Sequence, residues 1–233
     1  MSQIIKSNGQ YILFDPNYCS SDECAEIFSV DSLPDKVSKA GRGEAIFFRY
    51  GAYEMVAKHY LRGGLLSHFV HDQYFACDVE ATRAFKEWHL LGRMRALGLP
   101  VPKPVAARVL IQGCFYRADL VTEKINLAKT LAEKLTEVSL GYEAWQAVGV
   151  LIKRFHQLGV YHADLNANNI IINEQQELFL LDFDKGQIKL GEIWKINNIE
   201  RLLRSLLKGK KKKAQFNFEM TDWQQLLKGY SAT

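Results

Sequence analysis

The first half of the chain alternates short apolar runs with turn residues, a pattern that predicts β-strands. Runs at 45–50 and 53–60 flank Gly51 and predict a β-hairpin. The run at 119–125 predicts a last strand that leads into a hinge. Two further strands are expected before it, at 110–111 and 114–118. The alternation of polar and apolar positions therefore predicts a strand-rich first half.

Other apolar residues recur at helical spacing and predict amphipathic helices. One helix is expected to end at Gly98, because the prolines that follow prevent its continuation, and another to end at Gly159. Two more are expected between them and the C-terminus. Their apolar faces are formed, in chain order, by Phe85, Trp88, Leu91 and Leu97; by Trp145, Val148, Leu151, Ile152, Phe155 and Leu158; by Ile196, Ile199, Leu203, Leu206 and Leu207; and by Trp223, Leu226, Leu227 and Tyr230.

The two halves are expected to form lobes of one α+β fold. Neither an internal repeat nor a low-complexity linker separates them. We place the strand-rich lobe at 1–122 and the mainly helical lobe at 123–233. Hydrophobic residues make up 48% and charged residues 24% of the 233-residue chain, which is ordinary for a soluble globular protein.

The most informative segment runs from His162 to Asn169 and reads H-A-D-L-N-A-N-N. Asp182-Phe183-Asp184 follows 18 residues after the aspartate of this segment. Apolar runs at 170–172 and 178–181 enclose a polar turn at 174–177 and predict a β-hairpin between the two motifs. Such a hairpin would bring Asn169 and Asp182 together.

These residue types match the needs of phosphoryl transfer. That reaction requires a carboxylate beside the attacking hydroxyl and oxygen ligands on the metal ion that neutralises the phosphates. The spacing H-x-D-x-x-x-x-N followed by D-F-x is that of the kinase catalytic loop. We expect Asp164 to orient the hydroxyl and accept its proton, and Asn169 and Asp182 to hold Mg²⁺ with ATP. The motifs thus predict a bilobal protein-kinase-like fold with the nucleotide in the cleft.

Lys58 is the candidate for binding the nucleotide phosphates. It ends the sequence Met55-Val56-Ala57-Lys58, close to the V-A-I-K pattern of a kinase strand. Such a lysine needs a carboxylate partner from the next helix. We expect this partner to be Glu87, with Glu80 as the alternative two turns earlier on the same helix.

Two backbone segments are further candidates for nucleotide binding. The loop at 40–45 contains Gly41 and Gly43 in a G-x-G pattern, which could cover the phosphates with N–H groups while Arg42 adds a charge. The third glycine of a full G-x-G-x-x-G is replaced by isoleucine. At the hinge, we expect Glu123 and Ile125 to contact the nucleotide.

Charge and cysteine content narrow the possible partners. The chain has a formal net charge of +4, and its four cysteines lack metal-ligand spacing, which indicates reduced thiols used in packing.

No apolar run approaches the roughly 20 residues of a spanning helix, and the N-terminus lacks the apolar core of a secretory signal. Basic residues gather at 208–213, after Arg201 and Arg204. This run indicates either contact with an anionic membrane or a solvated loop, and no aromatic interleaving supports nucleic acid.

Departures from the protein-kinase pattern point to a small acceptor. Ala163 replaces the usual arginine of the catalytic loop, Asp184 replaces the glycine of D-F-G, and no A-P-E follows. The stretch after Asp182 is short for a protein-substrate platform. A small-molecule or sugar hydroxyl is the more natural acceptor.

The chain resembles the lipopolysaccharide-core kinases of Gram-negative bacteria. The resemblance rests on 161–170, 181–186, 61–65 and 85–104 and covers nearly the whole chain. It is strongest to the members that act on 3-deoxy-D-manno-octulosonic acid (Kdo). It implies transfer of the ATP γ-phosphate to the 4-hydroxyl of Kdo on a lipid A precursor, by a peripheral protein at the cytoplasmic face of the inner membrane.

An acidic acceptor would suit several basic residues. Kdo carries a carboxylate and the lipid carries phosphates, so Arg62, Lys185 and the lysine run would face anionic groups; solubilising surface charge is the alternative for each. Other acceptors remain open: heptose of the same core, an aminoglycoside-like molecule, or protein serine. A catalytically dead nucleotide-binding scaffold is disfavoured, because Lys58, Asp164, Asn169 and Asp182 are all retained.

Overall fold

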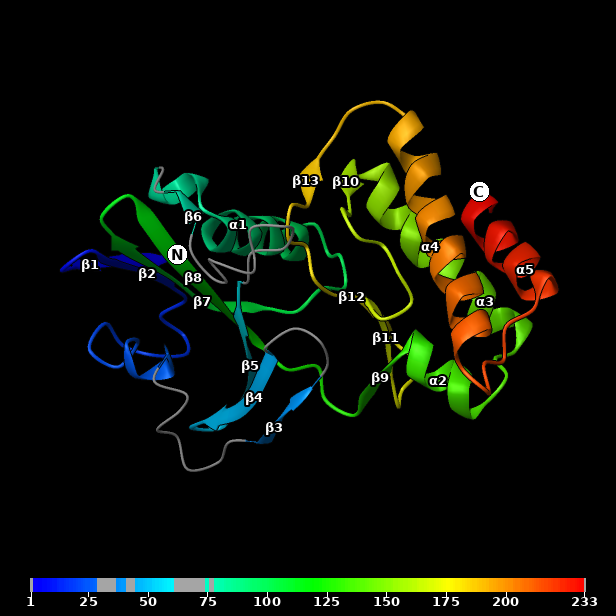
Figure 1. Ribbon diagram of the computed structural model, residues 1–233, viewed down its shortest axis with the longest axis horizontal. Helices are drawn as coiled ribbons and strands as arrows, with labels where there is room; N and C mark the ends of the chain where they lie inside the picture. Colours follow the sequence, from blue (N-terminus) through cyan, green and yellow to red (C-terminus); the bar gives the residue numbers. More distant parts are fainter. Residues whose placement is uncertain (1, 29–36, 41–44, 61–73, 76–77, 233) are drawn as a thin grey trace. The chain divides into compact units, whose positions relative to one another are not determined.

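A computed structural model describes residues 2–28, 37–40, 45–60, 74–75 and 78–232 of the chain (Figure 1). The chain divides into two compact units. The first comprises Met1–Arg93 and Pro102–Lys124, and the second comprises Met94–Val101 and Ile125–Thr233. The candidate residues Gly41, Arg42, Gly43 and Arg62 lie outside the described residues.

The first unit is built on an antiparallel sheet. Its described strands follow the order β1-β2-β7-β8-β5-β4-β3, and β6 pairs with β8. Their bounds are β1 Gln3–Ser7, β2 Gln10–Phe14, β3 Val37–Ala40, β4 Ala45–Tyr50, β5 Tyr53–His59, β6 Tyr74–Phe75, β7 Pro104–Gln112 and β8 Phe115–Glu123. Short 3₁₀ helices cover Glu26–Phe28 and Val79–Ala81, and α1 spans Arg83–Ala96.

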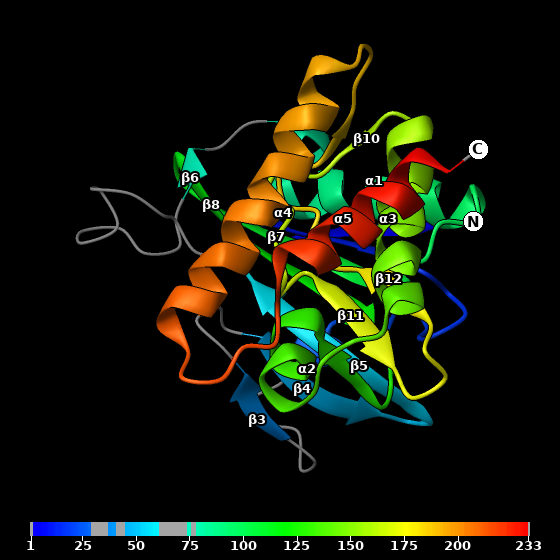
Figure 2. The same cartoon turned by 90° about the vertical axis from the view of Figure 1, so that its right-hand side faces the viewer.

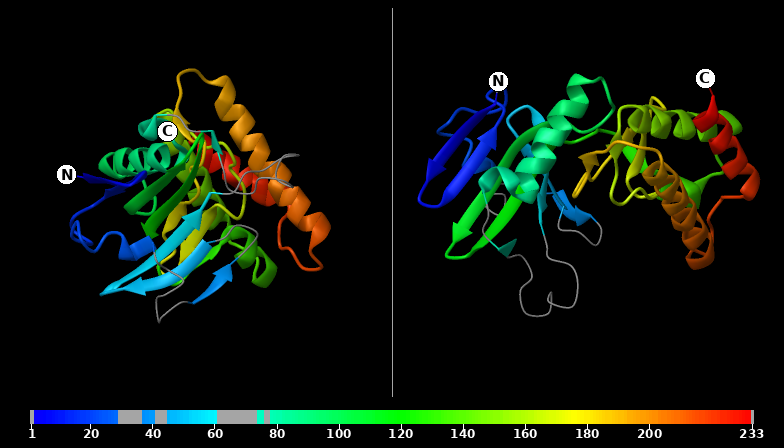
Figure 3. Two further views of the ribbon diagram at one scale, coloured as in Figure 1. Left: turned by 60° about the vertical axis from the view of Figure 1, so that its left-hand side comes forward. Right: turned by 90° about the horizontal axis from the view of Figure 1, so that it is seen from above.

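The two faces of this sheet are covered differently. Residues paired across antiparallel strands share a face, and β5 pairs with β8 so that Lys58 lies opposite Leu120 and Ala57 opposite Val121. The face of Lys58 is the one that α1 crosses (Figure 3). The face of Ala57 carries a core built with the segment after β2. That core contains Ile12, Phe14, Tyr18, Cys19, Cys24, Ile27, Phe28, Phe48, Met55, Ala57, Val105, Ala106 and Val121.

The second unit is mainly helical. Its helices are α2 Leu131–Glu137, α3 Tyr142–Gln157, α4 Ile193–Lys212 and α5 Met220–Ser231. Its short strands are β9 Ala128–Thr130, β10 Val160–Tyr161, β11 Ile170–Asn173, β12 Leu178–Leu180 and β13 Gln187–Ile188. The strands β12, β11 and β9 form one small sheet, and β10 pairs with β13. A capping box of Thr130 and Glu133 begins α2.

Helices α3 and α5 approach each other closely (Figure 2). A Cβ atom built on Gly149 would lie 2.1 Å from the carbonyl oxygen of Leu226, and one on Gly229 would lie 2.0 Å from that of Gln146. Both distances are far below van der Waals contact. The helix crossing therefore requires glycine at both positions.

Most predicted elements are confirmed within the described residues. The β4–β5 and β11–β12 hairpins, and the helices α3, α4 and α5, lie where the pattern placed them. The strands expected at 114–118 and 119–125 are instead one strand, β8, which passes through Asp119. Leu97 lies beyond the end of α1, so its assignment to the helix face was wrong. The mixed α+β class is confirmed.

The basic run at 208–213 is also placed by the structure. It forms the C-terminal end of α4 rather than a loop. Among the described residues, no helix is both long enough and apolar enough to cross a membrane. Cys19 and Cys24 are buried, as expected for packing residues, whereas Cys114 is exposed. Cys77 lies outside the described residues.

Candidate active site

The loop that carries the catalytic motif joins β10 to β11 and is held by a buried histidine. The backbone N–H of Asp164 donates to Nδ1 of His162 (3.1 Å). Because Nδ1 accepts, the imidazole proton of the neutral ring is on Nε2, which donates to the carbonyl oxygen of Leu181 (2.8 Å). One side chain thus ties the start of the loop to the residue before Asp182.

Two asparagines shape the loop around Asp164. Asn169 donates from Nδ2 to the carbonyl oxygen of Asp164 (2.9 Å). Asn166 donates from Nδ2 both to that carbonyl oxygen (2.9 Å) and to Oδ2 of Asp164 (3.1 Å). The Asp164 side chain is exposed at the surface of the second unit. The loop therefore presents an oriented carboxylate to solvent.

The β11–β12 hairpin brings the second motif to the first, as expected. Ile170 pairs with Leu180, and the N–H of Leu181 donates to the carbonyl oxygen of Asn169 (2.8 Å). Asp182 follows directly, with a φ of +60°. A left-handed conformation is costly for aspartate and is typical of functional positions. The structure thus places Asn169 and Asp182 at the same end of one strand pair.

Phe183 anchors the second motif in the core of the second unit. Its side chain is 1% exposed, and its ring lies 4.7 Å from that of His162 and 5.8 Å from that of Phe155 between centroids. A buried aromatic residue between two polar ones fixes the orientation of the strand end. The alternation of polar and apolar residues along this segment explains why Asp182 faces solvent while Phe183 does not.

The donor set of these two residues suits a hard divalent cation. The amide nitrogen of Asn169 is committed to the Asp164 carbonyl group, so its amide oxygen is the end left for a ligand role. Together with the carboxylate of Asp182 it supplies the oxygen ligands that Mg²⁺ prefers. The residues present therefore fit the ion that the motif implies.

Asn198 on α4 is a site residue that the sequence did not reveal. Its Oδ1 accepts from the N–H of His162 (3.2 Å), and its Nδ2 donates to the carbonyl oxygen of His162 (2.9 Å). Both residues are buried. No sequence motif marks this asparagine, which looks like any polar residue in an amphipathic helix.

In the first unit, Lys58 and Glu87 form the expected ion pair. Nζ of Lys58 lies 3.0 Å from Oε2 and 3.3 Å from Oε1 of Glu87. The carboxylate is 4% exposed and also accepts from the hydroxyl of Tyr60 (2.5 Å). Tyr60 also lies beneath the ammonium group, 4.7 Å from its ring centroid. The pair is therefore held rigidly between β5 and α1.

Glu80, the alternative partner, is placed elsewhere. It lies in the 3₁₀ helix Val79–Ala81 that precedes α1, not two turns earlier on the same helix as expected. Its Oε2 contacts Nε2 of His89 at 2.9 Å. The alternative is therefore excluded for the described conformation.

A cluster of charged side chains around the buried Asp119 lies on the opposite face of β5 from Lys58. Nδ1 of His59 lies 2.6 Å from Oδ1 of Asp119, and Nε of Arg108 donates to Oδ2 at 2.8 Å. Burial alone raises the pKa of Asp119, but these two partners outweigh it and hold the pKa below its usual value. This cluster explains why β8 continues through a charged residue.

Glu123 ends β8, and its groups are already engaged within the first unit. Its N–H donates to the carbonyl oxygen of Lys103 (2.9 Å), and its Oε2 accepts from the hydroxyl of Tyr18 (2.8 Å). Burial, and after it the neighbouring carboxylate of Glu123, raise the pKa of the Tyr18 hydroxyl. The hydroxyl therefore keeps its proton and can donate the hydrogen bond. Nucleotide contacts by Glu123 and Ile125 stay predictions. Lys185 is exposed, and its role also stays a prediction.

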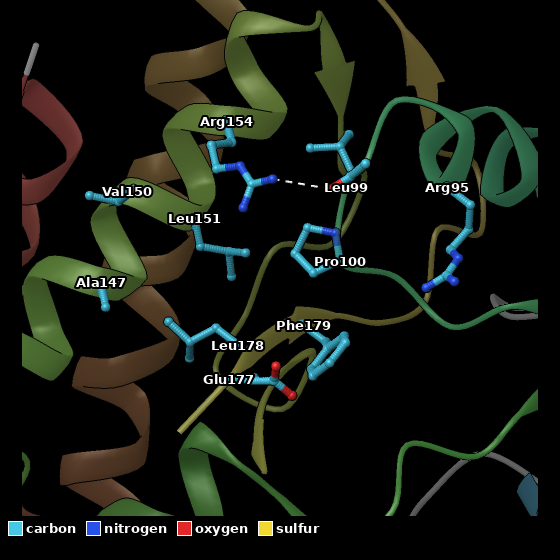
Figure 4. Close-up of a pocket in the computed structure, with 11 residues that line it drawn as sticks. Arg95, Leu99, Pro100, Ala147, Val150, Leu151, Arg154, Glu177, Leu178 and Phe179 are labelled. Carbon is cyan, nitrogen blue, oxygen red and sulfur yellow. Dashed lines mark hydrogen bonds between the residues drawn. The ribbon is translucent and has the colours of Figure 1, made fainter. Parts of the chain in front are cut away.

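A pocket of about 690 Å³ lies on the second unit, away from these residues (Figure 4). It is lined by the end of α1, by α3 and by β12, and Arg154 donates to the carbonyl oxygen of Gly98 at its rim (3.0 Å). None of the candidate site residues lines it. Chemistry is better assigned to the catalytic loop, where the carboxylates and asparagines converge.

Comparison with known proteins agrees with this geometry. Residues 34–230 match the model of the lipopolysaccharide kinase (Kdo/WaaP) family. A 3-deoxy-D-manno-octulosonic acid kinase of Photobacterium profundum is 38% identical over 96% of this chain and 95% of its own length. Kinases of the same name from Vibrio vulnificus and Haemophilus influenzae are 38% and 37% identical, each over 97% of this chain and over 91% and 98% of their own lengths. The chain therefore belongs to the lipopolysaccharide kinase (Kdo/WaaP) family.

Proposed function

We propose that this protein transfers the γ-phosphate of ATP to the 4-hydroxyl of Kdo on a lipid A precursor, in lipopolysaccharide core biosynthesis. The observation that carries the proposal is the connection between Asp164 and Asp182 through Asn169. Asn169 donates to the carbonyl oxygen of Asp164 and accepts from the N–H of the residue that precedes Asp182. Relatives named 3-deoxy-D-manno-octulosonic acid kinase match this chain over nearly its full length. As a kinase, the chain uses ATP as its phosphate donor.

Asp164 is the proposed catalytic base. Its carboxylate would accept a hydrogen bond from the acceptor hydroxyl, direct it at the γ-phosphate, and take its proton. Exposure of Asp164 makes it accessible to a large acceptor. The hydrogen bonds from Asn166 and Asn169 keep the loop from rearranging, which lowers the entropic cost of orienting the hydroxyl.

Asn169 and Asp182 are the proposed Mg²⁺ ligands. The ion would neutralise the charge on the nucleotide phosphates. The proposed role of Lys58 is to hold the α- and β-phosphates, with Glu87 and Tyr60 fixing the direction of its ammonium group. These roles require the two units to act as the lobes of a protein-kinase-like fold, which is part of the proposal.

Peripheral contact with an anionic membrane is also proposed, through α4. At its C-terminal end, Lys208, Lys211 and Lys212 are exposed. At its start, Ile193 and Ile196 are 80% and 60% exposed, and Leu190, which precedes the helix, is 96% exposed. Exposed apolar residues and lysines on one helix fit the boundary between lipid headgroups and acyl chains. A lipid-linked acceptor would be presented there.

Incubation of the purified protein with ATP, Mg²⁺ and Kdo-lipid A precursor tests the function. We expect a product heavier by one phosphate, located on the 4-hydroxyl of Kdo by fragmentation. Asp164→Ala should lower the rate by about 10²–10⁴-fold, whereas Glu174→Ala, which removes an exposed carboxylate from the β11–β12 turn, should not. Phosphate found on any other group of this acceptor, or no product at all, would overturn the proposed function.

A further inference from the structure

Asp164 has a second partner that lies outside the catalytic motifs. Nη1 of Arg201, on α4, lies 3.0 Å from Oδ1 of Asp164, while Asn166 donates to Oδ2. Arg201 is 37 residues away in sequence. The proposed base is thus held between an amide and a guanidinium group.

The ion pair is not needed to attach α4 to the catalytic loop. Asn198, one turn earlier, makes two hydrogen bonds to His162. Ser205, one turn later, accepts from the N–H of Ala167 through Oγ (3.2 Å). Residues at this spacing share one helix face. The hydrogen bonds of Asn198 and Ser205 therefore already fix the helix in the position that places Arg201 beside Asp164.

The ion pair between Arg201 and Asp164 also contributes little to the stability of the protein. The side chains of Arg201 and Asp164 are 47% and 59% exposed, and such pairs are worth about 0–1 kcal/mol. Arg204, one turn further, forms an ordinary surface pair with Glu200 on its own helix (3.5 Å). Arg204 has the same chemistry and similar exposure but no contact with the proposed base.

An acidic acceptor creates a problem that a cation at this position solves. In Kdo, the carbon that bears the carboxylate is separated from the carbon of the 4-hydroxyl by a single ring carbon. An acceptor hydroxyl placed on Asp164 therefore brings a second carboxylate close to the first, and like charges at short range repel strongly. A guanidinium group offers five N–H donors in a fork, enough to hold two carboxylates at once.

We propose that Arg201 bridges Asp164 and the carboxylate of the acceptor sugar. It thereby selects an acidic sugar and sets its hydroxyl against the base. This inference rests on the proposed function and names a residue that determines its specificity. Arg201 contacts the substrate directly. Its replacement should therefore slow transfer to acceptors that carry the carboxylate and should have little effect on transfer to acceptors that lack it.

The test compares two soluble acceptors, the methyl glycoside of Kdo and the methyl ester of that glycoside, which lacks the negative charge. Arg201→Gln should lower kcat/KM for the acid by about 10–100-fold, the effect of losing a charge-assisted hydrogen bond. For the ester it should cause little loss. Arg201→Lys should restore part of the rate with the acid, because it keeps the charge but not the fork.

Arg204→Gln is the matched control and should behave as wild type with both acceptors. Equal losses with acid and ester in Arg201→Gln, or no loss with either, would overturn the inference. If Arg201→Gln fails to fold, judged by its thermal melt, the acid-to-ester ratio of Arg201→Lys decides instead: a ratio equal to that of wild type overturns the inference. Wild-type enzyme that used neither the lipid-linked nor the soluble acceptors would fail the proposed function itself. If the wild type used acid and ester with equal kcat/KM, only the proposed role of Arg201 would be overturned.

Discussion

Asn198 on α4 brackets the backbone of His162, accepting from its N–H at 3.2 Å and donating to its carbonyl group at 2.9 Å. Both partners are buried, so neither backbone group can turn to water instead. Asn198→Ala should leave a buried donor and acceptor unsatisfied and cost about 1–3 kcal/mol of unfolding free energy for each group. Urea titration measures this loss, and phosphoryl transfer should fall with it.

The neighbouring Asn197 offers a matched control for this substitution. It is exposed on the same helix, so Asn197→Ala should change stability by no more than about 0.5 kcal/mol. A variant at position 198 that is as stable and active as the one at 197 would show that the bracket does not hold the loop.

The catalytic loop and hairpin were predictable because their information is local. The histidine, aspartate and asparagine lie within one loop, and the apolar runs beside it can form only a buried hairpin. Glu87 was predictable for a similar reason, since helical periodicity turns it toward β5. In each case the residues that fix the contact are close in sequence or share a strong period.

Asn198 and Arg201 were not predictable because their partners lie 36 and 37 residues away. On an amphipathic helix, a buried asparagine and an arginine that contacts the catalytic loop have the same sequence pattern as solvated residues. The break expected before Asp119 failed for a related reason. A charged residue looks like a strand end unless its partners, here His59 and Arg108, are known.

The crossing of α3 and α5 predicts that alanine at Gly149 destabilises the protein. Gly149→Ala would place a methyl group 2.1 Å from the carbonyl oxygen of Leu226, so the helices must separate. We expect a loss of at least about 1–3 kcal/mol, typical of overpacking. Thermal unfolding followed by circular dichroism should show the lower midpoint.

Gly92 in α1 is the control for this prediction. A Cβ atom there meets nothing within 4 Å, so Gly92→Ala should stabilise the protein by about 0.4–1 kcal/mol. An unchanged midpoint for Gly149→Ala would mean that the two helices can repack without cost.

His156 predicts a pH dependence of stability. Burial is the main cause that lowers its pKa from 6.5 to about 4. Between these values the unfolded chain binds a proton that the folded chain does not. The free energy of unfolding should therefore be greatest above pH 6.5 and fall towards pH 4, by at most about 1.4 kcal/mol per pH unit from this group.

Two variants separate burial from hydrogen bonding in this effect. His156→Gln should remove this part of the pH dependence in urea titrations. Tyr230→Phe removes the partner of Nδ1, 2.8 Å away, but leaves the ring buried, so the pH dependence should persist. The same slope in wild type and His156→Gln would assign the acid sensitivity to other groups.

Asp182→Asn tests the proposed metal ligand. An amide keeps the shape of the side chain but removes the charge that binds a divalent cation. The Mg²⁺ concentration that gives half-maximal activity should rise at least about tenfold. Lys58→Ala should instead raise the KM for ATP at every Mg²⁺ level. Metal titrations that coincide with wild type for both variants would contradict the division of roles between them.

The basic end of α4 predicts salt-sensitive binding to anionic vesicles. Lys210 and Lys213 already contact Glu219 and the carbonyl oxygen of Ala132. The exposed lysines 208, 211 and 212 are therefore the ones to neutralise. At about 1 kcal/mol per lysine, their replacement by glutamine should weaken vesicle binding by about 10²-fold. Sedimentation with vesicles that contain anionic lipid measures the bound fraction.

A matched variant removes the same charge from elsewhere on the surface. Lys6, Lys86 and Lys228 are exposed and scattered, so their joint replacement by glutamine should reduce binding far less. Surface attraction is screened over roughly 8 Å at physiological ionic strength, so wild-type binding should also fall as salt rises. Turnover of a soluble acceptor should be the same in all three proteins, because the lysines lie outside the catalytic loop. Equal pelleting of both triple variants at low salt would mean that net charge, and not α4, brings the protein to the membrane.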